Sequence, residues 1–389
     1  MRRKTLAVLV AAMLLMTLFA GGCGKSDNEG GADTASDVIK IGVFEPMTGE
    51  KASGGQMTVE GIKLANQLFP EVLGKKVEIV IVDNKSDKTE SYNAVKRLIE
   101  KDKVNAIIGS YGSAMSMAAG PAIKEAKIPT VGCSPTNPLV TQGNEYYFRV
   151  CFIDPFQGTV MAKYAVNTQG AKTACIITNV ADDYSVGLSN YFEQAFKKLT
   201  GNENAILAKL EYQTGSQDFT AQLASVKKAN PDVVFAPGNY GDVALLVKQA
   251  RELGINAPFL GGDTLEAPEF IEVGGQAVEG VALSTHYSAQ APATEASRKF
   301  VDEYKKVYNK EPNAFAALGY DAYMVILDAI QRANSADPLQ IRDALAETKN
   351  FEGATGIITM DENRDANKSA VILKVENGQF VYLTTVQPD

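Results

Sequence analysis

The feature that most restricts the fold of this chain is an alternation of short apolar runs with longer amphipathic segments. Eight apolar runs are expected to be strands: residues 39–44, 77–82, 106–108, 129–131, 174–178, 233–236, 259–261 and 281–284. Segments with helical periodicity lie between them, at 58–68, 89–101, 115–126, 156–167, 186–198, 219–229, 240–253 and 294–308. Strand and helix in alternation predict an α/β fold with mostly parallel sheets and helices on both faces. The β-branched runs lack polar alternation, as expected of strands buried on both faces.

A second group of elements follows near the C-terminus. Residues 314–332 and 338–348 have helical patterns, and 356–359 and 370–375 are expected to be strands. Two segments, 147–152 and 355–360, are expected to be extended connections. Some eight strand–helix units in a chain of 389 residues exceed what one hydrophobic core usually holds, so we expect two lobes.

The N-terminus has the pattern of an export signal. Basic residues at 2–4 precede an apolar run at 5–20, and Gly21 and Gly22 lead to Cys23. The run has about 16 residues, fewer than the roughly 20 that span a membrane, which argues against the alternative of a membrane anchor. The stretch resembles a bacterial lipoprotein signal, although Ala20 replaces the usual Leu. The resemblance implies that residues 1–22 are removed, that Cys23 is lipidated, and that the protein is held at the outer face of the cell membrane or in the periplasm.

Residues 24–37, which follow Cys23, are small and polar and are expected to form a flexible tether.

The charge and composition exclude several classes of function. The net charge is −8, with 38 basic and 46 acidic residues, and no basic cluster lies beyond the first residues, so a nucleic-acid partner is not expected. His286 is the only histidine and there is no tryptophan, so a multi-histidine metal site is excluded.

The cysteines are expected to be buried thiols. Cys133, Cys151 and Cys175 remain after Cys23, and an odd number leaves at least one thiol unpaired in an exported protein. Each lies in an apolar segment. A bridge between Cys133 and Cys151 is an alternative that no pattern supports.

The residues that directly follow the predicted strands are the candidate ligand contacts. Ligands of open parallel sheets bind outside the carboxyl ends of the strands. Gly109–Gly112 and Ser113 follow the strand at 106–108 and precede a helix, an arrangement that suits an anion such as a carboxylate. The alternative is that Ser113 only caps its helix.

Further candidates follow other strands. A turn with two prolines, 132–138, fixes a carbonyl at Ser134 and a hydroxyl at Thr136, although a plain turn is equally consistent. Asp263 follows the strand at 259–261, where a carboxylate could pair with an ammonium group or instead cap the next turn. Tyr184 and Tyr240 follow two more strands.

Metal, phosphate and hydrolase motifs are missing or incomplete. Asp361, Asn363 and Asp365 match the first positions of an EF-hand loop, but Ala366 stands where glycine is required, so a hairpin turn is expected. No phosphate-binding glycine motif follows a strand, and His286 has no G-x-S-x-G nucleophile motif to serve. We expect no metal and no cofactor.

Several motifs, in order along the chain, resemble the leucine/isoleucine/valine-binding proteins, which are solute receptors of amino-acid ABC importers. The matching segments are IKIGVFEPMTG at 39–49, AIIGS at 106–110, IPT at 128–130, SPTNP at 134–138 and DYSVG at 183–187. The similarity extends from about residue 38 to 383. It implies two Rossmann-like lobes that are joined by three crossings, at 149–153, 283–286 and 358–362, and that close on a ligand by hinge motion. The lobes would comprise 38–151 with 286–359, and 152–285 with 360–389, after the signal at 1–22 and the lipidated tether at 23–37.

The resemblance also implies roles for single residues. Ser113 matches the carboxylate-binding serine, and Asp263 the acid that pairs with the ammonium group. Ser134, Thr136, Tyr184 and Tyr240 match further contacts. The sequence departs from the family pattern at two positions. Relatives often carry an aromatic residue in the first loop that contacts the side chain of the ligand, but the matching position here is near Gly54, so this wall of the site is missing or supplied by another group. Asp263 replaces a longer Glu.

Three hypotheses on function remain at this point. The first is a monomeric, lipid-anchored receptor that captures an aliphatic L-amino acid and delivers it to the permease subunits of an ABC importer. The second keeps the fold but binds another small carboxylate, such as an aromatic acid, an amide or a γ-amino acid. The third is an exported enzyme that uses His286.

Overall fold

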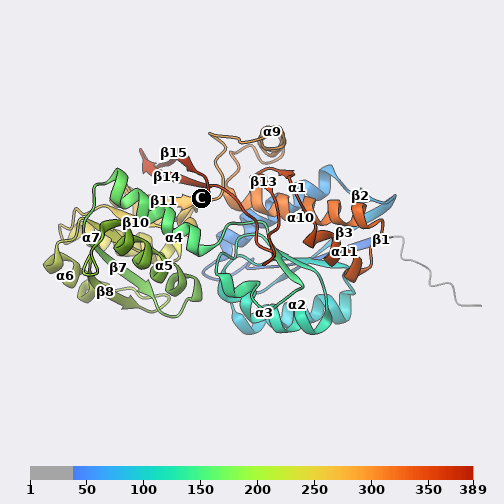
Figure 1. Cartoon of the computed structure of the whole chain (residues 1–389), viewed down its shortest axis with the longest axis horizontal. Coiled ribbons are helices and arrows are strands. Elements are labelled where there is room, and N and C mark those ends of the chain that lie inside the picture. The colour runs from blue at the N-terminus through green and yellow to red at the C-terminus, as the bar shows by residue number, and fades with distance from the viewer. Residues whose placement is uncertain (1–37, 389) are drawn as a thin grey trace, which may run out of the picture. The chain divides into compact units, whose positions relative to one another are not determined.

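The computed structural model describes residues 38–388, in which two β-sheets carry helices on their faces (Figure 1). The predicted signal at 1–22, Cys23 and the tether lie outside the described residues. In the first sheet the strand order is β2-β3-β1-β4-β5-β6. Its strands are β1 (Val38–Glu45), β2 (Glu71–Val72), β3 (Lys75–Asp83), β4 (Ala106–Ile108), β5 (Thr130–Gly132) and β6 (Tyr147–Arg149). All neighbours are parallel except the short β2, which pairs antiparallel with β3.

The second sheet has the order β15-β14-β11-β10-β9-β7-β8. Its strands are β7 (Ala174–Asn179), β8 (Ile206–Tyr212), β9 (Val233–Phe235), β10 (Phe259–Gly261), β11 (Ala282–Thr285), β14 (Ala370–Glu376) and β15 (Gln379–Val386). The pairs from β8 to β11 are parallel, whereas β14 and β15 add an antiparallel edge. The remaining strands, β12 (Phe351–Gly353) and β13 (Gly356–Ile358), form a separate two-stranded sheet. The predicted class, two lobes with mostly parallel sheets, is confirmed.

Helices from both ends of the chain cover the first sheet. They are α1 (Ala52–Leu68), α2 (Lys88–Arg97), α3 (Ser113–Ala126), α10 (Ala314–Ala333) and α11 (Pro338–Ala346), and α9 (Glu295–Tyr308) packs on α1 and β12. Figure 1 shows α1, in blue, beside α10, in orange. The two helices approach closely because Gly61 and Gly319 lack side chains: an added Cβ would lie 1.8 Å from the Ala316 carbonyl oxygen and 2.2 Å from that of Thr58, respectively.

The second sheet is covered by helices from the middle of the chain. They are α4 (Asp154–Lys163), α5 (Asp183–Thr200), α6 (Thr220–Ala229), α7 (Tyr240–Glu252) and α8 (Pro268–Gly274). The chain therefore passes between the lobes three times, after β6, after β11 and before β14. The exact residues that divide the lobes stay a prediction. No helix within residues 38–388 combines the length and the apolar character that a membrane crossing requires.

The sequence located the eight buried strands to within two residues, but it misjudged other elements. Helix α1 begins at Ala52 rather than at residue 58, because Gly54 and Gly55 weaken the helical pattern. The helices predicted to end at 101 and 167 finish instead in π-helical turns, Leu98–Asp102 and Tyr164–Thr168. Strands β8 and β15 were missed, because many of their side chains are only partly buried and the apolar runs are therefore interrupted.

Candidate functional site

Asp263 lies at the centre of a buried polar cluster in the second lobe. It follows β10 and begins a short 3₁₀ turn, Asp263–Leu265, which its side chain does not cap. Its Oδ1 accepts hydrogen bonds from Gln157 Nε2 at 2.8 Å and from the Tyr184 hydroxyl at 2.9 Å, and its Oδ2 lies 3.1 Å from His286 Nε2. The alternative role of Asp263 as a cap is therefore wrong, and its carboxylate is fixed in orientation.

The cluster leaves acceptor capacity for a cation. A carboxylate has about four acceptor positions, and these three donors leave one on Oδ2. Gly262 permits the arrangement, since an added Cβ there would lie 2.0 Å from the Tyr184 hydroxyl oxygen. An ammonium group at Asp263 would pair with a carboxylate whose orientation is already fixed by hydrogen bonds from uncharged donors.

His286 contributes to this cluster as a neutral donor. Its ring is buried and stacks on Phe152 with a centroid distance of 3.8 Å. Burial lowers the pKa of His286 despite the nearby Asp263, so the neutral ring donates from Nε2. Its Nδ1 has no hydrogen-bond partner in residues 38–388, so no hydroxyl or thiol in this range is hydrogen-bonded to the imidazole as a nucleophile would be.

Ser113 lies at the first position of α3, in the first lobe. The helix begins after Gly112, which has a φ of 88°, and no side chain caps it. The Ser113 Oγ instead accepts a hydrogen bond of 3.1 Å from the backbone N–H of Asn137. Ser113 therefore does not serve as the cap, and the first N–H groups of α3 have no side-chain acceptor.

Arg149 holds the turn that carries Ser134 and Thr136. This fully buried side chain donates through Nη1 to the carbonyls of Pro135 at 2.6 Å and Asn137 at 2.8 Å. The Ser134 Oγ and Thr136 Oγ1 atoms are buried and have no hydrogen-bond partner among the described residues. Because buried hydroxyls are normally hydrogen-bonded, this pair is a candidate contact for a ligand.

Asp154 is a further candidate for the site, which the sequence analysis did not single out. Its backbone N–H donates to the Thr136 carbonyl at 2.9 Å, and both of its carboxyl oxygens are buried without a hydrogen-bond partner in the described chain. Burial raises the pKa of Asp154 to about 8. The group is therefore mostly protonated at neutral pH and could donate a hydrogen bond. The only sequence signal was its place directly before Pro155, which is typical of a helix start.

The two candidate tyrosines of the second lobe have different surroundings. Tyr184 reaches Asp263, as described above. The Tyr240 hydroxyl donates to the Glu50 carbonyl of the first lobe at 2.8 Å and accepts from the Ser53 N–H at 3.3 Å. Tyr240 thus joins the two lobes in this structure.

Tyr111 occupies the space beside Gly54. An added Cβ at Gly54 would lie 2.3 Å from the Tyr111 ring, and this ring meets Phe315 edge-to-face with centroids 5.0 Å apart. Tyr111 precedes Ser113 by two residues, and its backbone N–H donates to Glu45 at 2.7 Å. An aromatic group from a different loop therefore fills the place where a side chain at position 54 would lie.

Residues 38–388 contain neither a cluster of metal-ligating side chains nor a disulfide bond. No group of three metal-ligating side chains occurs in residues 38–388. Cys133, Cys151 and Cys175 are buried free thiols, which rules out the bridge between Cys133 and Cys151 in this structure. The segment from Asp361 to Asp365 is a turn closed by a bridge between Met360 and Ala366, as the sequence predicted.

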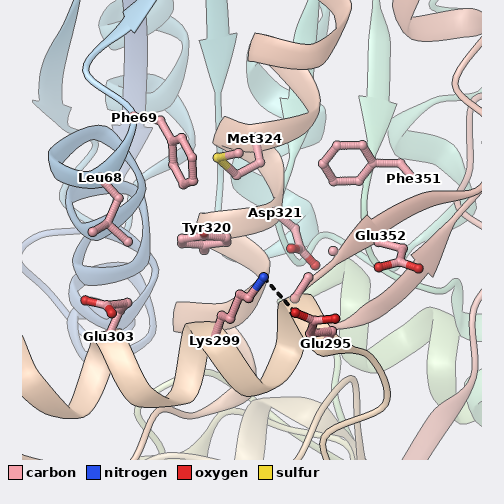
Figure 2. A pocket seen from close by; sticks show the side chains of 12 residues that line it. Leu68, Phe69, Glu295, Lys299, Glu303, Tyr320, Asp321, Met324, Phe351 and Glu352 are labelled. Carbon is pink, nitrogen blue, oxygen red and sulfur yellow. Dashed lines mark ion pairs between the residues drawn. The ribbon is translucent and has the colours of Figure 1, made fainter.

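Two surface cavities lie away from the candidate site residues. One of about 660 Å³ lies between α1, α9, α10 and β12, where Figure 2 shows Lys299 paired with Glu295 at 2.8 Å. A second, of about 790 Å³, extends from α1 to the turn between β14 and β15. None of the predicted ligand contacts lines either one. The candidate contacts are instead buried between lobes that touch each other.

Comparison with known proteins identifies the class of this molecule. A family model described as a periplasmic binding protein matches residues 38–379, so the chain belongs to the periplasmic binding protein family. The solved structure of a leucine-binding protein LivK from Thermotoga maritima is 48% identical, with a TM-score of 0.87, over 90% of this chain and 99% of that one.

Two further relatives carry related descriptions. A branched-chain amino acid transporter substrate-binding protein LivJ from Streptococcus pneumoniae, solved in complex with isoleucine, is 31% identical with a TM-score of 0.84, over 90% of this chain and all (100%) of that chain. A leucine-, isoleucine-, valine-, threonine- and alanine-binding protein from Pseudomonas aeruginosa is 29% identical over 85% of this chain and 88% of its own length. The chain is therefore a solute-binding protein of the branched-chain amino acid ABC transporter family.

Proposed function

We propose that this protein captures an aliphatic L-amino acid between its lobes and delivers it to an ABC importer. The observation that carries the proposal is the arrangement of opposite recognition groups on the two lobes. Ser113 and the uncapped start of α3 suit a carboxylate, and the buried carboxylate of Asp263 suits an ammonium group. An α-amino acid carries both groups at a fixed spacing.

The division of the binding groups between the two lobes explains how the protein would capture a ligand. A ligand that bridges Ser113 and Asp263 interacts fully only when the lobes are together, so its binding energy favours the closed form. The unpartnered hydroxyls of Ser134 and Thr136 add hydrogen bonds beside the carboxylate. The buried rings of Tyr111 and Phe315 are candidates for the wall around the ligand side chain, and the Tyr111 hydroxyl has no hydrogen-bond partner among the described residues.

The cellular setting forms part of the same proposal. The lipoprotein-like signal at 1–22 and Cys23 support a monomer that is anchored by lipid outside the cytoplasmic membrane, where it would meet the permease subunits of its importer. Mass spectrometry of the protein from a membrane fraction tests this part: a diacylated N-terminal Cys23 is expected, and an unmodified or uncleaved chain contradicts it.

A thermal-shift screen of the twenty amino acids tests the ligand. At 100 times its dissociation constant, a ligand adds about 2.7 kcal/mol of stability and raises the melting temperature. Leucine, isoleucine, valine, alanine and threonine are the expected hits. If none of the five raises the melting temperature while benzoate or γ-aminobutyrate does, the fold serves a different small carboxylate and the proposal is wrong about the ligand.

A further inference from the structure

The loop before α1 clasps the second lobe through polar contacts. Lys51 Nζ lies 3.0 Å from Asp182 Oδ2, and their side chains are only 6% and 7% exposed. On either side, the Glu50 carbonyl accepts from Asn239 Nδ2 at 2.9 Å, and the Ser53 Oγ donates to Glu269 at 2.6 Å. Together these three contacts form an interlobe clasp. Its first-lobe residues, Glu50, Lys51 and Ser53, directly precede Gly54 in the sequence.

Lys51 is charged and fixed within this clasp. Burial alone would lower its pKa, but the surrounding carboxylates, Asp182 first and then Glu50 and Asp242, more than compensate, and the pKa of Lys51 is raised. Its backbone N–H donates to the Ser86 Oγ at 3.1 Å, which holds the loop against the first lobe. The ammonium group therefore reaches across to the other lobe from a supported backbone.

Asp182 connects this ion pair to the ammonium anchor. Its second oxygen, Oδ1, caps α5 by accepting from the Tyr184 N–H at 3.2 Å. The hydroxyl of Tyr184 in turn donates to Asp263 at 2.9 Å. A continuous set of contacts thus leads from Lys51 in the first lobe to Asp263 in the second.

We propose that Lys51 is a positioning residue for ligand capture: its ion pair with Asp182 forms as the lobes close, secures the start of α5, and so slows the release of the ligand. The inference rests on the proposed function in that it takes an amino acid to be the ligand that closes the lobes. Lys51 itself is not assigned a contact with the ligand.

The test compares Lys51→Met, Asp182→Asn and the double variant, using leucine, valine and threonine as probes in calorimetry and stopped-flow release. Lys51→Met leaves the Asp182 carboxylate buried without its cation and is expected to weaken binding by about 30-fold or more, mostly through faster release. Asp182→Asn leaves Lys51 with the Glu50 carboxylate at 3.7 Å and is expected to weaken binding by a smaller factor. The double variant removes both charges and is expected to bind at least fivefold more tightly than Lys51→Met.

The neighbouring pair Lys88 and Asp183 provides a matched control. It also joins the lobes, at 2.9 Å, but its side chains are 51% and 41% exposed. Lys88→Met is therefore expected to change the affinity by less than about threefold. Melting temperatures without ligand are expected to agree among all variants, because the proposal has the ion pair form only as the lobes close on a ligand.

The outcomes separate the inference from the proposed function. If the wild type binds none of the three amino acids, the proposed function and the inference built on it are both wrong. If the wild type binds one of them but Lys51→Met releases it at the wild-type rate, only the inference is overturned. Equal losses of melting temperature with and without ligand would likewise overturn it, because they would give Lys51 a purely structural role.

Discussion

Replacing Asp263 by Asn is the most direct test of how this site recognises an ammonium group. The substitution keeps the shape of the side chain and removes its charge. The amide oxygen can still accept from Gln157 and Tyr184, and the amide nitrogen then faces His286 Nε2. Neutral histidine can move its proton to Nδ1 and accept at Nε2, so all three contacts of residue 263 can be kept. The Nδ1 proton gains no acceptor among residues 38–388, so the protein should fold with a modest loss of stability.

The expected loss of affinity is large. In the wild type, the ammonium group of the ligand would be paired with a carboxylate that is buried with 1% exposure. Truncating one partner of such a pair costs about 2–5 kcal/mol, largely because the other charge stays buried and unpaired. This cost corresponds to a weakening of about 30-fold to several thousand-fold. Asp263→Ala should weaken binding similarly, but it also leaves three donors without an acceptor and is expected to lower stability.

Titration calorimetry with the best amino acid from the screen measures this loss. Asp302→Asn on the exposed face of α9 serves as the control and should bind as the wild type does. An Asp263→Asn protein with the wild-type melting temperature and an affinity within threefold of wild type would refute the assignment of Asp263. Lost affinity together with a collapsed melting temperature would show that the variant had damaged the fold, and Asp263→Glu would then be the variant to measure.

Three further perturbations follow from the structure. Gly54→Ala places a Cβ 2.3 Å from the Tyr111 ring and should cost about 1–3 kcal/mol of stability by thermal unfolding. Arg149→Met leaves Asp365 buried without its 2.5 Å partner and should cost about 3–5 kcal/mol by urea unfolding. Burial raises the pKa of Asp154 from 3.8 to about 8, so the folded state retains a proton that the unfolded state loses, and this group lowers stability as the pH rises between those values. The stability of Asp154→Asn relative to wild type should therefore increase from pH 4.5 to pH 8 in calorimetric scans.

Each of these predictions has a control or an opposing result. Gly241→Ala in α7 meets no atom within 4 Å and should be neutral or stabilising by up to about 1 kcal/mol. Arg342→Met removes ion pairs with exposed acidic partners and a cation–π contact with Tyr146, and should cost about 1 kcal/mol, well below the cost of Arg149→Met. A stability of Asp154→Asn relative to wild type that falls as the pH rises from 4.5 to 8 would contradict the buried, protonated carboxyl.

The sequence predicted the sheets well because of where their strands lie. β1, β4 and β9 are buried on both faces, so unbroken β-branched runs identify them. β8 lies at the edge of its sheet and alternates between partly buried and exposed side chains, so no such run marks it. The early start of α1 was hidden because its first turn contains two glycines, one of which makes room for Tyr111.

The candidate site was predictable where it depends on strand ends and not where it depends on packing between distant segments. Ser113 and Asp263 each come directly after a strand, and parallel topology brings such positions to one edge of each sheet. The donor Gln157 comes from a helix, and Lys51 from a loop that contacts the other lobe. Neither contact has a local pattern, because each depends on a partner more than 100 residues away in the chain.

The single histidine gives this protein a built-in spectroscopic reporter. The imidazole signals of His286 need no assignment in an NMR spectrum, because no other histidine contributes. The ring is hydrogen-bonded to Asp263 and stacked on Phe152, so its nitrogen shifts report the tautomer that the carboxylate selects. A cation that arrived at Asp263 would change those shifts, so the occupancy of the ammonium anchor could be followed in nitrogen-15-enriched protein of unaltered sequence.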